Sequence, residues 1–456
     1  MASPAASDRE FHVKPDPWSA FRGKRILLLQ GPVGPFFRSL AQRLRASGAE
    51  VHKVNFNGGD WLFFPAGAIS WRGGMQDWPT YFESLLQDLQ IDIVLLFGDC
   101  RPIHRVARQI GHRRGVRVGA FEEGYVRPNF ITFERFGVNG YSLLPRRPGF
   151  YAEISDAPRP ERGVGNTFWW AALWAALYYV ASGLLHPLFR RYRHHRPLTL
   201  LEVLPWIRAA WRKQVYRWRE RTILPRLTGS LSKRFFLVPL QVSIDSQIFE
   251  HSRFTSVTDF IRHVVASFAR HAPKDLALVI KHHPFDRGYH DHRRLIRQLA
   301  AESGLSDRLL YVHDQHLPTL LDHARGVVVI NSTVGFSALT HGVAVKTLGV
   351  AVYDLRGLTF DGPLNEFWRG AESFRPDAKL LRRFRAYTIE QTQLNGSFYA
   401  GPIDALPCAA LLSVARQVRT CDAPTNADTG NGFATLPVDS AASRARDPLG
   451  LITLRS

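Results

Sequence analysis

The amino-acid sequence predicts an α/β protein made of two α/β blocks that a helical segment, rich in basic and aromatic residues, joins together. Two observations carry this prediction. Apolar runs of strand length alternate with helical stretches before residue 150 and again after residue 233. Between the blocks this alternation stops, and Trp, Tyr and Arg gather instead. Strands that alternate with helices favour a parallel sheet with helices on both faces.

The first block covers residues 24–150 and follows an N-terminal extension of residues 1–23. Apolar runs predict its strands at residues 25–30, 50–56, 91–99 and 115–124. Apolar residues at helical spacing predict the intervening helices at residues 36–48, 79–90 and 101–115. The first and the last of these helical stretches end on glycine, which is typical of a helix C-terminus.

The joining segment covers residues 151–232, and its residues 168–185 (FWWAALWAALYYVASGLL) carry no charge. The basic run FRRYRHHR follows at residues 189–196. The length of the apolar stretch permits a short transmembrane helix, but its five Trp and Tyr residues favour a position at the lipid headgroups. Contact with a membrane surface is the favoured interpretation. A true span and a helical hairpin buried between the domains stay open as alternatives.

The second block covers residues 233–421. Its strands are predicted at residues 235–245, 276–284, 309–314, 326–332 and 344–354. Its helices are predicted at residues 256–272, 291–304, 317–326 and 333–342. The tail, residues 422–456, is rich in Ala, Asp, Thr and Gly with little periodicity, which predicts disorder.

The composition points to an anionic partner and to a reducing compartment. The 59 Lys and Arg outnumber the 39 Asp and Glu by 20, and such a surplus suits anionic lipid or a phosphorylated substrate. Scattered arginines without a helix-turn-helix or RNP pattern argue against nucleic acid. The three cysteines form no C-x-x-C pair and the histidines no metal motif, so we expect no metal. The N-terminus lacks an apolar signal region, which predicts a protein of the cytoplasm or of its membrane face.

Ligands of doubly wound folds bind outside the carboxyl ends of the strands, so polar residues at these ends are the candidates for a site. The loop QGPVGPFF follows the first strand, and Gly31 and Gly34 could let a substrate approach the backbone. The loop lacks G-x-G-x-x-G and the Walker lysine. An ordinary tight turn is therefore the favoured interpretation.

Carboxylates follow two further strands. Glu122 and Glu123 precede Gly124 in EEGYVRP, where one carboxylate can tune the pKa of the other for acid or base work. Arg127 could hold an anionic substrate group. The alternative is a solvated pair in a turn. Asp245, expected at a strand end in QVSID, could be a nucleophile, could orient a hydroxyl, or could only cap the next helix.

The second block also offers an anion site. Lys281 and His283 end a strand in KHHP, and their charges suit a phosphate. Asn331, Ser332 and Thr333 end another strand at a helix N-terminus, where backbone N–H groups and hydroxyls bind anions. Ser332 could instead serve only as a helix cap.

In this order, the motifs QGPVGPFF, FGDCRPIH, EEGYVRPN, VPLQVSIDSQI, KHHP and NSTVGFSALTHG resemble those of bacterial CMP-sugar transferases of the GT-B type. The nearest resemblance is to the capsular polysaccharide synthesis and export family of β-Kdo transferases, and within it to the member that starts the lipid linker. It covers about residues 24–368. It implies a GT-B-like fold, in which two Rossmann-like domains face a cleft that holds the donor.

The resemblance also implies the chemistry. The donor is CMP-Kdo, and no further cofactor is expected. The acceptor is a lyso-phosphatidylglycerol at the inner leaflet, so the protein would be peripheral on the cytoplasmic face beside the capsule synthesis and export complex. Glu123, in preference to Glu122, becomes the acid/base candidate and Asp245 the candidate nucleophile of a retaining double displacement.

The same resemblance implies the binding residues. His283 and Lys281 would face the CMP phosphate, with Ser332 and Thr333 below it, and Asn331 and Gln241 are further candidates for substrate binding. Two alternatives remain. One is a GT-B transferase with another nucleotide sugar, and the other is a non-catalytic, membrane-docked component that couples polymer synthesis to export.

Overall fold

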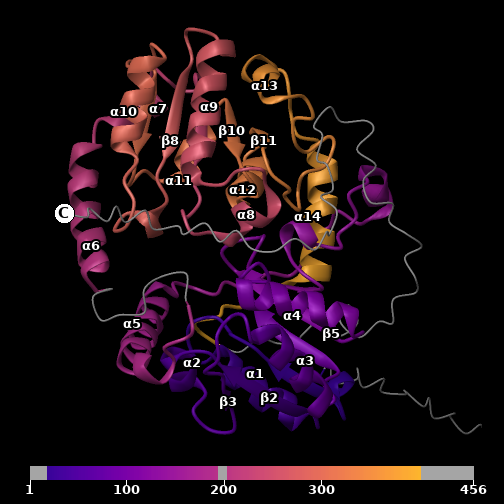
Figure 1. Cartoon of the computed structure of the whole chain (residues 1–456). Coiled ribbons are helices and arrows are strands. Elements are labelled where there is room, and N and C mark those ends of the chain that lie inside the picture. The colour runs from indigo at the N-terminus through magenta and orange to yellow at the C-terminus, as the bar shows by residue number, and fades with distance from the viewer. Residues whose placement is uncertain (1–17, 194–202, 402–456) are drawn as a thin grey trace, which may run out of the picture. The chain divides into compact units, whose positions relative to one another are not determined.

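The computed structural model describes residues 18–193 and 203–401, and there the chain folds around two β-sheets (Figure 1). The strands of the first sheet are β1 (Arg25–Leu28), β2 (Glu50–Asn55), β3 (Ile69–Ser70), β4 (Ile93–Phe97), β5 (Arg117–Glu123), β6 (Phe130–Arg135) and β12 (Gln393–Asn395). Those of the second sheet are β7 (Phe235–Pro239), β8 (Ala277–Lys281), β9 (Leu309–Val312), β10 (Gly326–Val329) and β11 (Ala344–Thr347).

Helices connect the strands in each block. Those of the first block are α1 (Phe36–Ala46), α2 (Gly58–Phe63), α3 (Trp78–Asp88) and α4 (Pro102–Arg113). The joining segment forms α5 (Phe168–Leu184), α6 (Val203–Arg219) and α7 (Ile223–Thr228). The remaining helices are α8 (Ser246–His251), α9 (Val257–His271), α10 (Arg293–Glu302), α11 (Leu317–His323), α12 (Thr333–Thr340), α13 (Leu364–Gly370) and α14 (Ala378–Thr392). Short 3₁₀ helices lie at Ser19–Phe21, Asn139–Tyr141, Pro148–Glu153, His186–Leu188 and Pro284–Asp286.

Both sheets have the doubly wound strand order. The first runs β12-β6-β5-β4-β1-β2-β3, and the second runs β11-β10-β7-β8-β9. Strands β1 to β5 pair in parallel with their neighbours, as do β7 to β11, whereas β6 and β12 pair antiparallel at one edge. Every residue of β7, β8 and β10 is buried, because helices cover both faces of the second sheet. The predicted GT-B-like fold of two Rossmann-like blocks is confirmed.

Several strand ends differ from the prediction. Pro239, which has no N–H to donate, is the last residue of β7, and beyond it the Leu240 backbone N still donates to the Lys281 carbonyl at 2.9 Å, so Asp245 does not lie at a strand end. The strand predicted over residues 344–354 ends at Thr347. Strand β6, absent from the prediction, forms an antiparallel hairpin arm against β5.

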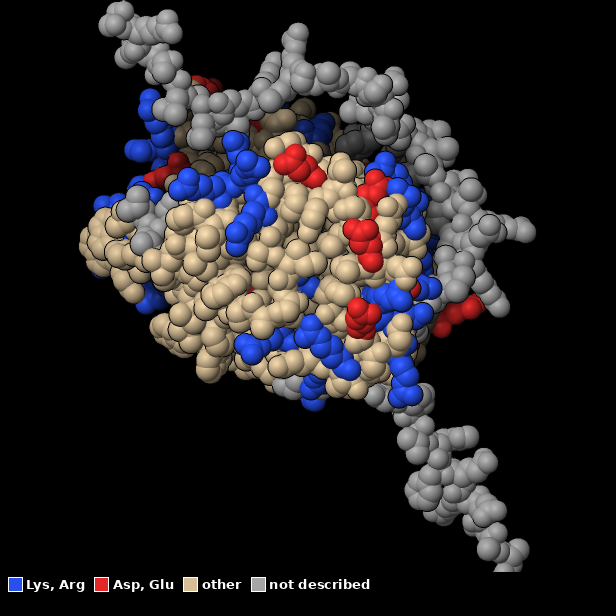
Figure 2. Space-filling model, turned by 60° about the horizontal axis from the view of Figure 1, so that its bottom comes forward, with Lys and Arg blue, Asp and Glu red and all other residues tan. Residues whose placement is uncertain are grey.

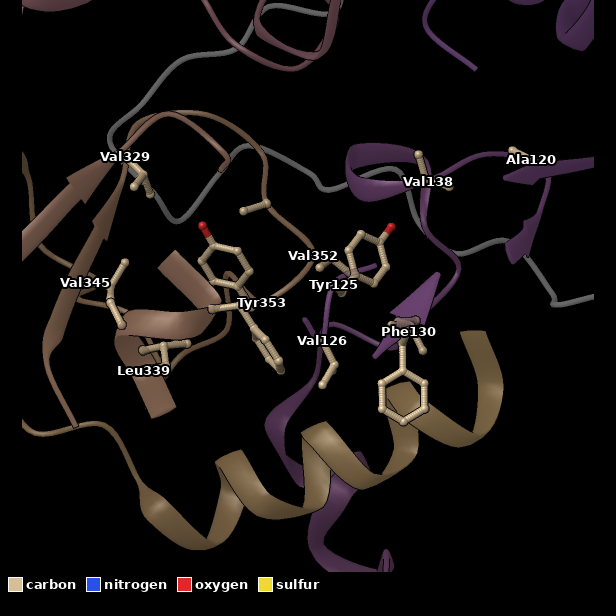
Figure 3. Packing of buried hydrophobic residues seen from close by; sticks show 14 of the residues in the cluster. Ala120, Tyr125, Val126, Phe130, Val138, Val329, Leu339, Val345, Val352 and Tyr353 are labelled. Atoms are coloured by element: carbon tan, nitrogen blue, oxygen red, sulfur yellow. The ribbon is translucent and has the colours of Figure 1, made fainter. Parts of the chain in front are cut away.

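The two blocks share apolar contacts. Figure 3 shows Tyr125 and Val126 of the first block beside Val352 and Tyr353 of the second, with α14 running past them. From α14 the chain enters β12, which pairs antiparallel with β6 of the first sheet. Residues 393–395 therefore complete the first sheet, although the sequence places them in the range of the second block. The predicted tail at residues 422–456, most of the N-terminal extension and the end of the basic run lie outside the described residues.

The joining segment is not a buried hairpin. Tyr178 and Ser182 of α5 are buried against α2, but the other side of α5 exposes large apolar side chains to solvent. These exposed residues are Phe168, Trp169, Trp170, Leu173, Leu177, Val180 and Leu184. Among the described residues, no helix is both long enough and apolar enough to span a membrane.

Candidate active site

The site lies where the winding direction of each sheet reverses. In a doubly wound sheet this switch point opens a crevice outside the carboxyl ends of the two central strands. In the first sheet these strands are β1 and β4, and Gln30 and Asp99 follow them. In the second sheet they are β7 and β10, and Gln241 and Asn331 follow them.

Three predicted residues of the second block form one hydrogen-bonded network. The Gln241 Nε2 donates to Asp245 Oδ2 and to Asn331 Oδ1, both at 3.0 Å. The Asn331 backbone N donates to Gln241 Oε1 at 3.3 Å, and its Nδ2 donates to the Gln247 carbonyl at 3.0 Å. The Gln241 amide thus uses both of its N–H donors and its oxygen. This network fixes the orientation of the Asp245 carboxylate.

Asp245 is the N-cap of α8, where its Oδ1 accepts from the Gln247 backbone N at 2.9 Å. Burial raises the pKa of Asp245, and the hydrogen bonds from Gln241 and Gln247, together with the charge of Arg127, act against this rise. The capping role is therefore present, and the nucleophilic role stays a hypothesis. Arg127 belongs to the first block, so a charge of the first block acts on the pKa of a carboxyl group in the second.

Glu122 and Glu123 belong to β5, so they are not a solvated pair in a turn. Successive side chains of a strand point to opposite faces. Glu123 lies on the face of Phe121, which packs against α1, and its Oε1 accepts from the Tyr399 hydroxyl at 3.1 Å. Glu122 points to the other face, where burial, with Asp99 nearby, raises its pKa to about 8 and Arg101 acts against the rise. The two carboxyl groups therefore have different environments.

The raised pKa of Glu122 predicts a pH-dependent stability. Between the usual pKa of a glutamate, about 4.3, and about 8, the folded protein holds a proton that the unfolded chain has lost. The free energy of unfolding therefore falls as the pH rises through this window. Glu122→Gln is neutral at every pH, so its melting temperature should fall less than that of the wild type between pH 5 and pH 8.5. Thermal unfolding at a series of pH values checks this, and parallel curves would contradict it.

Arg127 follows β5 in the loop that begins with Gly124. Its Nε donates to the Gly124 carbonyl at 3.1 Å, and its side chain is exposed. Its charge lowers the pKa of Asp245 and also acts on Tyr399, which donates to Glu123. An exposed guanidinium whose charge acts on Asp245 and on Tyr399 is placed to meet an anionic substrate group.

Asp99 and Gln247 link the two blocks, and the sequence reasoning missed both. Asp99 is fully buried, and its Oδ1 accepts from Gln247 Nε2 at 3.4 Å, while its Oδ2 accepts from the Val138 backbone N at 3.1 Å. Beside them, Asn139 Oδ1 accepts from the Val352 backbone N at 3.0 Å. A polar residue directly after the apolar strand in FGDCRPIH was the available signal for Asp99.

The joining helix α5 reaches the switch point of the first sheet. Gln30 Nε2 donates to the Tyr178 hydroxyl at 3.2 Å, and this hydroxyl donates to Asp60 Oδ1 at 3.1 Å. Arg101 donates to Gln30 Oε1 at 2.9 Å. The helix with the exposed apolar face is thus hydrogen-bonded to the candidate site. No local pattern in the sequence indicated this contact, because Tyr178 and Gln30 are far apart along the chain.

Gly31 and Gly34 are packed against the protein's own aromatic rings. A Cβ at Gly31 would lie 2.8 Å from the Phe37 ring, and a Cβ at Gly34 would lie 3.1 Å from the Trp174 indole. Gly34 also has a φ of +114°, which disfavours any other residue. These contacts agree with the tight-turn interpretation. A substrate contact at the two glycines stays a prediction.

The predicted anion residues lie at the same edge of the second sheet. Lys281 is buried, and burial, with the charge of Arg287 adding to it, lowers its pKa. His283 accepts from the Phe285 backbone N at 3.2 Å, and Ser332 Oγ accepts from the Val334 backbone N at 3.3 Å as the N-cap of α12, which Thr333 begins. The cap at Ser332 is present, and the binding of a phosphate by these residues stays a prediction.

Two doubly wound sheets with polar networks at both switch points define a protein with a GT-B-like, glycosyltransferase-type fold. The chain belongs to the family of capsule polysaccharide biosynthesis proteins, whose family model matches residues 92–399. It is 44% identical over 388 residues to the capsule polysaccharide export protein KpsS of Escherichia coli, covering 83% of this chain and 97% of that protein. It is 40% identical over 390 residues to the capsule polysaccharide modification protein LipB of Neisseria meningitidis serogroup B, covering 83% of this chain and 92% of that protein.

Solved structures also match along most of the chain. The S. aureus MnaA-UDP co-structure covers 84% of this chain and 94% of its own, with 12% identity and a TM-score of 0.32. A glycosyltransferase from Rickettsia africae covers 81% of this chain and 98% of its own, with 10% identity and a TM-score of 0.31.

Proposed function

We propose that this protein transfers Kdo from CMP-Kdo to a lyso-phosphatidylglycerol at the cytoplasmic face of the inner membrane, and so starts the lipid linker of a capsular polysaccharide. One observation carries the proposal. Glu123 of the first block and the network of Gln241, Asp245 and Asn331 in the second block lie at the carboxyl ends of the two sheets, and the charge of Arg127, from the first block, acts on Asp245. The family assignment supports the capsule as the destination.

The proposed reaction has two displacements. The Asp245 carboxylate attacks the anomeric carbon of Kdo, and the bond to the CMP phosphate breaks, so that its electron pair leaves with CMP. Lys281 offers positive charge to the departing phosphate, and His283, whose Nδ1 accepts from the Phe285 backbone N, offers it the N–H of Nε2. A hydroxyl of the acceptor then attacks the same carbon, Glu123 takes its proton, and the electrons of the bond to Asp245 return to the carboxylate. Two inversions retain the anomeric configuration.

A membrane-docking face supports the choice of a lipid acceptor. The exposed side of α5 carries large apolar residues and no charge, and such a patch is typical of a contact with lipid or protein. Figure 2 shows a broad, mostly uncharged area on the left, where α5 lies in Figure 1, with Lys and Arg around it. Arg190, Arg191 and Arg193 follow α5 along the chain, and each basic residue near an anionic surface contributes about 1 kcal/mol.

The docking face predicts how the protein binds vesicles. Leu184 of α5 is 64% exposed, and Leu143 of the first block is 66% exposed. The Leu184→Glu variant should bind phosphatidylglycerol vesicles about tenfold more weakly than the wild type, since it places a negative charge on the apolar face. Leu143→Glu is the matched control and should bind as the wild type does. Sedimentation with vesicles measures both, and equal weakening in the two variants would contradict docking through α5.

A transfer assay tests the proposed function. Purified protein is supplied with CMP-Kdo, generated in situ because it is labile, and with a fluorescent lyso-phosphatidylglycerol. We expect mass spectrometry to detect an acceptor heavier by one or more Kdo units. Transfer from a different nucleotide sugar but not from CMP-Kdo would overturn the donor, and the absence of transfer from any of them would overturn the enzymatic function.

The E. coli relative is named a capsule polysaccharide export protein, and this name favours a second candidate function. In this alternative the protein is a membrane-docked component that couples polymer synthesis to export without catalysis. It predicts that capsule reaches the surface of cells that carry Glu123→Gln, whereas Leu184→Glu impairs this step. The proposed transferase predicts loss of capsule in Glu123→Gln as well.

A further inference from the structure

A mostly apolar pocket of about 710 Å³ lies between α1, α5 and residues 398–401. Phe36, Leu40, Trp170, Trp174, Phe398 and Tyr399 are among its lining residues. The volume falls within the range of roughly 300–1,000 Å³ that small-molecule sites occupy. Its lining does not include the residues that bind or attack the donor in the proposed reaction.

One lining residue of the pocket is hydrogen-bonded to the candidate base. Tyr399 lines the pocket, and its hydroxyl donates to Glu123 Oε1 at 3.1 Å. Trp174 Nε1 donates to the Tyr399 carbonyl at 3.1 Å, which fixes the tyrosine against α5. The Phe36 ring meets the Phe398 ring edge-on, with centroids 5.0 Å apart. Aromatic side chains thus line the pocket as far as Tyr399, which contacts the Glu123 carboxylate.

The outer side of the pocket joins the docking face of α5. Trp170 stacks on Trp174 with ring centroids 5.6 Å apart, and it is 50% exposed. Leu173 and Leu177, which follow Trp170 at helical spacing, are also exposed. Arg43 of α1 lines the same pocket and adds a positive charge beside its apolar wall. The pocket therefore lies between an exposed apolar face and Tyr399, the hydrogen-bond partner of Glu123.

We propose that this pocket binds the acyl chain of a lysophospholipid acceptor and so presents the headgroup hydroxyl to Glu123. The inference rests on the proposed function, and it identifies a binding site within it. A lipid that leaves the bilayer loses the apolar contacts of its CH₂ groups, and an apolar pocket beside the docking face replaces these contacts. A lipid with one chain needs one such pocket. Arg43, which lines the pocket, provides positive charge for the lipid phosphate.

A pair of matched variants tests the pocket kinetically. Ser39 lines the pocket from an exposed position on α1, and Ser84 lies at an exposed position on α3 outside it. Ser39→Trp should raise the KM for a long-chain lyso-phosphatidylglycerol by about tenfold and leave kcat unchanged, because it fills the pocket without touching the carboxylates. It should also flatten the dependence of KM on chain length. Ser84→Trp should behave as the wild type does. Equal KM values for the two variants would overturn the proposal.

A cross-linking experiment is independent of transfer. A lyso-phosphatidylglycerol with a diazirine near the end of its chain is irradiated with the full-length protein, and the modified peptides are mapped by mass spectrometry. We expect labels on residues 35–46, 170–174 and 398–401, which Ser39→Trp reduces and Ser84→Trp does not. Labels confined to the outer residues of α5, or no labels, would overturn the pocket. Labels in the pocket without transfer from CMP-Kdo would retain the lipid site and reject the proposed donor.

Discussion

Glu123→Gln is expected to lower kcat for Kdo transfer by about a hundredfold or more, which is the contribution of a positioned general base. Glutamine has the shape of glutamate, and its Oε1 can still accept from the Tyr399 hydroxyl that now contacts Glu123. The variant loses only the ability to take the acceptor proton. Its melting temperature should therefore stay close to that of the wild type, and steady-state kinetics beside thermal unfolding separate the two effects.

Tyr399→Phe provides the comparison for this variant. Tyr399→Phe removes the hydroxyl that donates to Glu123 Oε1 and leaves the carboxylate in place. The variant should lose much less of kcat than Glu123→Gln does, since Tyr399 positions the base but does not take the proton. Full transfer activity in Glu123→Gln would contradict the assignment of the base and would favour the role in export coupling.

Local patterns in the sequence were sufficient to predict the fold. The alternation of apolar runs and helices predicted both parallel sheets, and these place Gln241 and Asn331 at one switch point. The predicted end of the strand over residues 235–245 was wrong, because apolar residues continue past Pro239, where the strand ends. The pairing of strands that are far apart along the chain could not be predicted from local patterns. Strand β12 joins β6 across more than half of the chain, and its three residues have no period of their own.

Only part of the site could be predicted, because local patterns in the sequence do not show long-range contacts. The sequence placed Glu122 and Glu123 at a strand end, and alternation alone sends their side chains to opposite faces. Which face meets Tyr399 and which is buried near Asp99 depends on elements that are distant in the sequence. Tyr399 itself lies in a short segment after β12 without any recognisable motif. Residues that act through tertiary contacts of this kind have no local signal to find.

Asp245→Asn and Asp245→Ser are expected to lower kcat by about a thousandfold or more, as the loss of a nucleophile does, while both keep the N-cap of α8. Asparagine and serine are as good as aspartate at a helix N-cap, so the hydrogen bond to the Gln247 backbone N can persist. Asp245→Ala removes the cap as well, and its free energy of unfolding should fall by about 1 kcal/mol. Kinetics and chemical unfolding of the three variants give both quantities.

Asp377 is the matched control for the capping role alone. It caps α14 by accepting from the backbone N–H groups of Lys379 and Leu380, both at 2.9 Å, and it is exposed. Asp377→Ala should lower stability by about 1 kcal/mol without a change in kcat, so loss of a cap by itself cannot explain an inactive Asp245 variant. A Kdo adduct trapped on Asp245 in Glu123→Gln would show the covalent step directly. If Asp245→Asn transfers Kdo at the wild-type rate, the carboxylate is only a cap, and the reaction must proceed without a covalent intermediate on this residue.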